Sequence, residues 1–151
     1  MFEQERYIES TIETFKNELR NILPDVDFPV GIPNVGDERF TLDKPVVSVR
    51  YRSSANIDGH LGKNTGRGTK VKRKLLNLFV LVITTGNNEA ILQRDRICQK
   101  IENHFSDESV YQRLYSQGFS GSEARFGNSY RVREGVHLAR VEIFTEVKFI
   151  N

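Results

Sequence analysis

The strictest constraint on the fold is the alternation of side chains over residues 139–150. Every second residue of this stretch belongs to one of two sets, of which one is mainly apolar and the other is mainly charged. The first set is Ala139, Val141, Ile143, Thr145, Val147 and Phe149, and the second is Arg140, Glu142, Phe144, Glu146, Lys148 and Ile150. A period of two places the sets on opposite faces of a β-strand. The pattern therefore predicts a strand of an antiparallel sheet with one buried face and one half-polar face.

Two earlier segments also have the pattern of strands. Residues 45–52 alternate apolar and polar side chains, and residues 72–85 are apolar on both faces through most of their length. The second pattern is typical of a central strand that is covered on both sides. Residues 53–69, rich in Gly, Ser, Asn and Lys, predict a long hairpin loop between them. Residues 124–133 fit either one strand or a hairpin that turns at Gly127-Asn128.

Two segments have the spacing of amphipathic helices. Residues 3–23 carry Ile8, Ile12, Phe15, Leu19 and Ile22 at steps of three and four, and Pro24 ends the helix. Residues 89–105 form the second helix, and its inward residues are expected to be Ile91, Leu92, Ile97, Cys98, Ile101 and Phe105.

The remaining segments are expected to be irregular. All four prolines lie between residues 24 and 45, which predicts a turn-rich passage with a short edge strand at residues 27–32. Residues 106–121 have no clear period, so we expect irregular structure there as well.

These elements predict a single α+β domain over residues 1–151. Its core is an antiparallel sheet of four to five strands with two helices packed on one face, plus the long hairpin loop. The charged N-terminus predicts no signal peptide, and the longest apolar stretch, residues 75–83, is shorter than the ~20 residues that span a bilayer. We therefore expect synthesis in the cytoplasm and no membrane partner.

The charge distribution is uneven along the chain. Residues 1–27 carry seven acidic and three basic residues, whereas residues 61–74 carry six basic residues and no acid. The basic residues, expected to contact a partner, are Lys63, Arg67, Lys70, Lys72, Arg73 and Lys74. Glu5, Glu9 and Glu13 are expected at a contact between subunits, because opposite charges on one chain favour head-to-tail association. The alternatives for the basic run are a nucleic-acid-binding module and a solvated loop.

Catalytic motifs are incomplete throughout the chain. A phosphate-binding loop fails because Gly62-Lys63 is followed by Asn64, and residues 118–122 miss the nucleophile-elbow spacing by one position, which favours a turn there. The histidines, His60, His104 and His137, are scattered, so surface or capping roles are expected, and Cys98 falls on an apolar stripe. We expect no catalytic residue, no cofactor and no metal. The alternative is a pocket that gathers His104 or His137 with acidic residues.

The order of elements resembles that of the tail terminator proteins of tailed bacteriophages, also called tail completion or neck proteins. An amphipathic helix and a proline-rich segment precede the strand Pro45-Val46-Val47-Ser48-Val49-Arg50 and a long loop. A core strand ending in Thr84-Thr85-Gly86, a helix and the closing strand Arg140–Phe149 complete the pattern. The likeness covers nearly the whole chain and lies in the pattern of elements rather than in signature residues.

The resemblance implies a structural protein of the virion and not an enzyme. Members of that family form a hexameric ring that caps the tail tube, ends its polymerisation and offers a docking surface to the head–neck connector. In contractile tails the ring also meets the sheath, and DNA passes through its lumen. By this resemblance, the loop at residues 53–69 reaches toward a neighbouring subunit, the tube or the lumen.

Overall fold

The computed structural model describes residues 2–3, 6–57, 63–64 and 70–150, and of residues 2–3, 63–64, 70–72 and 149–150 it describes the backbone. Nine helices and strands occur in these ranges. In chain order they are β1 (Phe2–Glu3), α1 (Tyr7–Ile22), β2 (Val46–Asn56), β3 (Lys63–Asn64), β4 (Lys70–Thr85), α2 (Asn88–Ser106), α3 (Glu108–Ser116), β5 (Phe119–Arg133) and β6 (Val136–Ile150).

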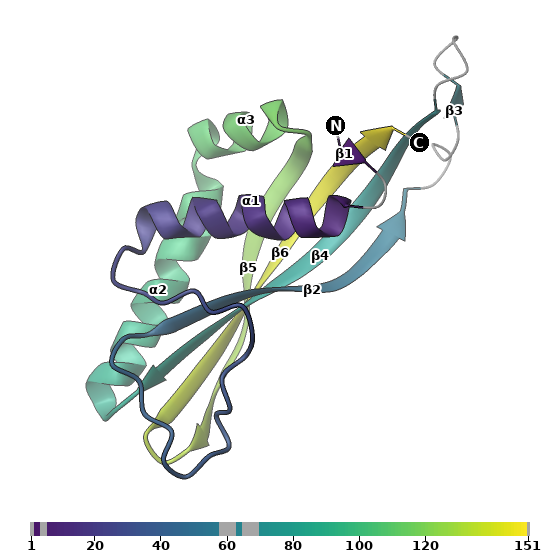
Figure 1. Cartoon of the computed structure of the whole chain (residues 1–151). Coiled ribbons are helices and arrows are strands. Elements are labelled where there is room, and N and C mark those ends of the chain that lie inside the picture. The colour runs from purple at the N-terminus through teal and green to yellow at the C-terminus, as the bar shows by residue number, and fades with distance from the viewer. Residues whose placement is uncertain (1, 4–5, 58–62, 65–69, 151) are drawn as a thin grey trace.

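Four long strands form an antiparallel sheet in the order β2, β4, β6, β5. The two short strands lie at its margins, where β1 pairs in parallel with the end of β6 and β3 pairs with the start of β4. All three helices lie on one face of the sheet (Figure 1). The predicted α+β class and antiparallel sheet are confirmed, but the described chain has three helices rather than two.

The closing strand β6 follows its predicted alternation. Ala139, Val141, Ile143, Thr145 and Val147 are buried beneath the helices, and the residues between them are half-buried on the other face. Val141 pairs with Val80 of β4, so the buried sets of the two strands share one face. That shared face, with Phe15 and Leu19 of α1, forms the main core.

Helix α1 begins later than predicted, because Phe2–Glu3 pairs with the end of β6 instead of joining the helix. Helix α2 differs from the prediction in the residues that it buries. Ala90 and Arg94 are buried, while Leu92 is 53% exposed. Leu92 lies two positions from Ala90, which places it on the opposite side of an α-helix. The prediction that Leu92 faces inward is therefore wrong.

The segment expected to be irregular, residues 106–121, contains helix α3. Asp107 begins it, because its side-chain oxygen accepts a hydrogen bond from the backbone nitrogen of Ser109 at 2.8 Å. Val110 and Leu114 are buried one turn apart, so this short helix packs by a single pair of apolar side chains. Of the motif at residues 118–122, Gly118 lies in the turn expected there, with its backbone nitrogen bonded to the Tyr115 carbonyl oxygen, but residues 119–122 begin β5, where the Ser122 and Thr145 hydroxyls lie 2.8 Å apart.

Strand β5 runs straight through Gly127-Asn128, so the hairpin alternative for this segment is wrong. The pairing with β6 shifts between Phe126 and Asn128. A Cβ at Gly127 would lie 3.1 Å from the carbonyl oxygen of Arg140, which explains why glycine occupies this irregular position. The actual turn is Glu134-Gly135, where Gly135 has a φ of 77°.

Residues 25–45, which we call the strap, cross from the helix layer to the other face of the sheet. The edge strand expected at residues 27–32 is reduced to one bridge, in which Asp27 pairs with Val46. Val35, Phe40 and Leu42 then pack against a second apolar cluster, formed by Val46, Leu81, Ile83, Val136 and Leu138. Strand β4 is thus covered on both faces at its Leu81–Ile83 end, as predicted, but Leu75 is 42% exposed.

The hairpin between β2 and β4 has longer strands than expected. Pairing continues to Asn56 opposite Lys74, within the segment predicted as loop, and β3 pairs with the first residues of β4. This end of the sheet projects beyond the helices (Figure 1). His60 and Arg67 lie outside the described residues. No helix of the described ranges is long and apolar enough to cross a membrane.

Candidate interaction surfaces

The sheet face opposite the helices is divided into two halves. The strap covers the half around Leu81 and Ile83, and in the described chain no helix or strand lies on the other half, which we call the open half-face (Figure 1). Its charged residues are Arg50, Arg52, Arg73, Arg125, Arg140, Glu123, Glu142 and Glu146, and its apolar residues are Leu75, Phe79 and Phe144. This surface therefore combines five guanidinium groups, three carboxylates and exposed apolar area.

Opposite charges on the open half-face form pairs. Arg73 Nη2 lies 2.6 Å from Glu146 Oε2, Arg125 Nη2 lies 2.7 Å from Glu123 Oε1, and Arg52 donates to Glu142. These side chains are partly or largely exposed, so each pair contributes at most about 1 kcal/mol to stability. The pairs therefore set the positions of the charges on this surface and add little to the stability of the sheet.

Guanidinium groups also cover the aromatic rings of this surface. The Arg140 guanidinium lies 4.3 Å from the ring centre of Phe79, and that of Arg125 lies 5.3 Å from the ring centre of Phe144. Three buried side-chain atoms here have no hydrogen-bond partner among the described residues: Nε of Arg73, Nε of Arg140 and Oδ1 of Asn77. Buried polar atoms are usually paired, so these three atoms are exceptions within the fold.

The predicted basic run divides between the two faces of the sheet where its side chains are described. Arg73 points to the open half-face and binds Glu146, whereas Lys74 points to the helix layer, with Nζ 5.2 Å from the ring centre of Tyr7. Lys63 lies in β3 and Lys70 and Lys72 lie in β4, where the backbone alone is described. Arg67 falls outside the described residues. A role of this run in partner contact stays a prediction.

The predicted inter-subunit acids lie on the exposed side of α1, apart from Glu5, which is not described. Glu9 lies 3.9 Å from Arg6 Nε and Glu13 lies 3.4 Å from Arg20 Nη1. The acidic residues of the helix are thus accompanied by basic neighbours. Their contact with another subunit stays a prediction.

A buried carboxylate that sequence reasoning missed joins the three helices. Glu18 of α1 is only 6% exposed and accepts hydrogen bonds from Nε and Nη2 of Arg113 of α3, at 2.8 and 2.7 Å. His104 of α2 places Nε2 2.8 Å from the same carboxylate. The bonds from Arg113, more than that with His104, hold the pKa of Glu18 below its usual value although burial raises it. His104 therefore binds a partner inside the fold, unlike the surface or capping role expected for it.

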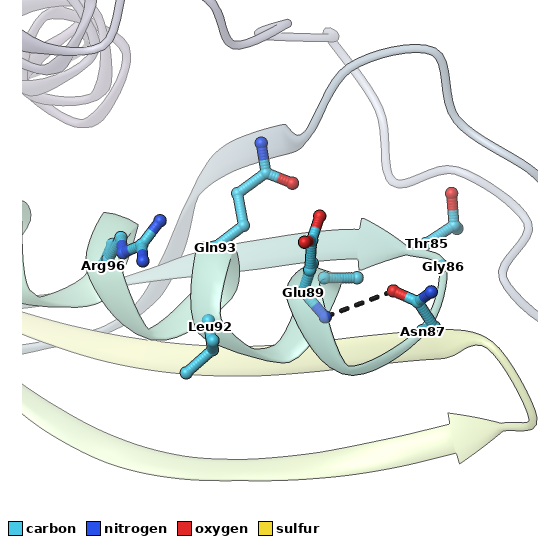
Figure 2. A pocket seen from close by; sticks show the side chains of 8 residues that line it. Thr85, Gly86, Asn87, Glu89, Leu92, Gln93 and Arg96 are labelled. Atoms are coloured by element: carbon cyan, nitrogen blue, oxygen red, sulfur yellow. Dashed lines mark hydrogen bonds between the residues drawn. The ribbon is translucent and has the colours of Figure 1, made fainter.

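The first turn of α2 borders a hollow of about 480 Å³, shown in Figure 2. Asn87 caps the helix by accepting from the backbone nitrogen of Glu89 at 3.2 Å, and Glu89 and Gln93 point to one side of the helix while Leu92 points to the other (Figure 2). Of the polar groups visible here, Asn87 caps the helix and the Thr85 hydroxyl bonds Leu42 of the strap.

A second hollow, of about 670 Å³, lies between this corner, the strap and the β5–β6 turn. Its cationic side chains mostly have partners within the fold. Arg94 lies 3.0 Å from Asp95, His137 Nε2 lies 3.1 Å from the carbonyl oxygen of Gly86, and Arg133 binds the strap. These contacts join neighbouring segments, which is a structural role.

Cys98 is buried in the core, as predicted. Burial raises the pKa of its thiol to about 12, so the nucleophilic thiolate is scarce near neutral pH. Within the described residues there is no group of three or more His, Cys, Asp or Glu residues that could hold a metal ion.

Comparison of the sequence with models of known protein families and with curated proteins finds no match.

Proposed function

We propose that this chain is a structural assembly protein of the tail-terminator type, which forms a ring on the end of a phage tail tube and ends its polymerisation. The same ring would offer its other surface to the head–neck connector and, in a contractile tail, contact the sheath. The protein would thus reside in the virion, with DNA passing through the lumen. The proposal assigns no catalytic step to the chain.

The observation that carries the proposal is the projecting end of the sheet. Strands β2 and β4 continue past the helix layer (Figure 1), and most side chains of β2 from Tyr51 to Asn56 are exposed. A hairpin that packs little against its own domain gains stability when a partner covers it. The length of this hairpin is therefore best explained by contact with a neighbouring subunit or with the tube.

The edges of the sheet are poorly suited to pairing with a strand of another copy. Subunits are therefore expected to associate through the faces of the domain. The two outer long strands, β2 and β5, both deviate from regular pairing: β2 shifts between Tyr51 and Ser53, and β5 shifts at three places. Bulges on an outer strand discourage edge-to-edge aggregation. A ring built from different surfaces of one chain avoids that hazard and closes when the rotation between subunits permits.

The test is imaging and mass measurement of the purified protein, alone and mixed with tail tubes. We expect hexameric rings in native mass spectrometry and, in negative-stain images, rings at tube ends with a narrow distribution of tube length. Replacing Lys63, Arg67, Lys70 and Lys72 together by Ala should weaken capping. Replacing Arg96 and Lys100 of α2, which are exposed away from the hairpin, by Ala should leave capping unchanged. A wild-type protein that stays monomeric and never binds tube ends would contradict the proposal.

A nucleic-acid-binding module is the second candidate, favoured by the position of the basic run. The pairing of Lys63 with Val71 and of Asn64 with Lys70 gathers basic residues at the projecting end of the hairpin. Backbone phosphates would bind such a cluster without reading sequence. Duplex DNA affinity should then fall steeply with salt, and the quadruple alanine variant should reduce that slope. An unchanged slope would eliminate this candidate.

A further inference from the structure

The strap shows how this sheet holds an extended segment of chain. Arg133, on the strap side of β5, donates to backbone carbonyl oxygens of four strap residues, Val35, Asp37, Glu38 and Phe40. Arg50 of β2 donates to the carbonyl oxygen of Val30 at 3.2 Å. Arginine side chains on the sheet thus bind the strap through its backbone, while Phe40 and Leu42 fill the apolar surface beneath it.

The outer surface of the strap is acidic and partly apolar. Residues 25–45 contain five acidic and two basic residues, a net charge of −3. Asp37, Glu38 and Asp43 are exposed, and so are the two basic residues, Arg39 and Lys44. Ile32 is 47% exposed, and Val30, which is 92% exposed, lies beside α1 before the strap reaches the other face of the sheet. The strap therefore presents carboxylates and aliphatic side chains outward.

The open half-face has the complementary chemistry. It carries five arginines against three glutamates, although Arg50 already binds the strap of its own chain, and Leu75 is exposed on it. Its net positive charge is opposite to the net charge of the strap, and this complementarity favours contact between the two surfaces.

We propose that a second copy of this chain docks on the open half-face through its strap. The inference rests on the self-association contained in the proposed function and adds the surfaces that perform it. Each copy carries both surfaces, so contacts can repeat from subunit to subunit. A nucleic acid fits this surface less well, because Glu142 and Glu146 would face its phosphates and the guanidinium groups already cover both aromatic rings.

The test is an exchange of charges between two variants. One variant carries Arg52→Glu and Arg125→Glu on the open half-face, and the other carries Glu38→Lys and Asp43→Lys on the strap. In either variant alone like charges meet, so association should weaken at least about tenfold in sedimentation velocity. In an equimolar mixture every contact again joins opposite charges, and the assembly should regain its wild-type size with alternating copies.

Glu108→Lys with Gln112→Lys is the control, because it changes the charge of two exposed positions on α3, outside both surfaces, and should leave association unchanged. Circular dichroism shows whether each variant folds, and Arg125→Gln, a milder change, should weaken association in the same direction. Recovery in the mixture cannot arise from misfolded copies.

Three outcomes would overturn the inference. If the wild type still assembles, none of them contradicts the proposed function. They are undiminished association of both charge variants, a mixture that does not recover, and loss of single-stranded oligonucleotide binding in the arginine variant with association intact. Conversely, a mixture that recovers a twofold dimer would support docking of the strap and contradict the ring. The two proposals can therefore fail separately.

Discussion

The covered half and the open half of the sheet face opposite the helices share the same strands but differ in composition. In the covered half, Leu81, Ile83 and Leu138 form an apolar floor for the strap. In the open half, the same strands present Arg73, Arg140 and Glu146. The composition changes from apolar to charged along each strand. The sequence therefore specifies the surface of each half separately.

The two halves also differ in how their guanidinium groups are used. In the covered half, Arg133 donates hydrogen bonds to carbonyl oxygens of the strap. In the open half, Arg52, Arg73 and Arg125 pair with glutamates of the same surface instead of with a covering segment. The strap thus completes one half within the chain, and we propose that a second copy covers the other.

The largest expected contrast comes from truncating one apolar residue in each half. Ile83→Ala removes a fully buried side chain beneath the strap, so the free energy of unfolding should fall by about 3 kcal/mol. Leu75→Ala removes an exposed side chain and should cost less than about 1 kcal/mol in the isolated protomer. Urea unfolding measures both. Equal losses would mean that the open half is covered in the free protein.

The next contrast separates the two kinds of arginine. Arg133→Ala removes the donors that hold the strap and should lower the free energy of unfolding by about 2 kcal/mol. The strap should also become sensitive to limited proteolysis within residues 33–43. Arg131→Ala, an exposed residue two positions earlier on β5, is the control. If both variants resist protease equally, the arginine contacts do not hold the strap.

A third experiment asks which carboxylates sustain the fold. Glu18→Gln weakens the bonds with Arg113 and His104 and should cost about 1.5 kcal/mol at neutral pH. Because the pKa of Glu18 is lowered by folding, its contribution is present above the ordinary value of 4.5 and is lost as the pH falls through the folded pKa. The variant should therefore lose less stability than the wild type on acidification. Parallel curves would assign acid sensitivity to other carboxylates, including those of the open half-face.

The smallest expected effect lies on the open half-face itself. Arg52→Ala and Arg125→Ala each remove one exposed ion pair and should change the unfolding free energy of the protomer by less than about 1 kcal/mol. The measurement is made at a concentration where the protein is dissociated. A loss of several kcal/mol would show that these residues support the protomer and would remove the contrast between the halves.

The sequence predicted best where a regular period was strong. The alternation of β6 and the stripe of α1 were both confirmed, because one face of each meets the same core. Helix α3 was missed since only Val110 and Leu114 are buried, too few to establish a period, although Asp107 supplied a capping signal. Strand β5 was ambiguous because the sequence Gly127-Asn128 is typical of a turn. In the structure, Gly127 instead allows close approach to the backbone of Arg140.

The candidate surfaces were harder to predict, because they depend on contacts between distant segments. The open half-face gathers arginines from β2, β4, β5 and β6, and only Arg73 of β4 lies in a strongly basic run of the sequence. Glu18 gave one local signal, since it lies between Phe15 and Leu19 on the apolar stripe. Its partners, Arg113 and His104, could be assigned only after the helices were placed.

The pairing of β1 with β6 has a practical consequence for engineering. Residues 2–3 lie beside residues 149–150, so the two ends of the described chain meet at the same margin of the sheet (Figure 1). A short linker could join them, and the chain could be reopened at Gly36-Asp37, where both residues are exposed. Such a circular permutant would keep the helix layer and all four long strands in place while dividing the strap in two. It would turn the strap into a pair of free ends that can be lengthened, labelled or exchanged.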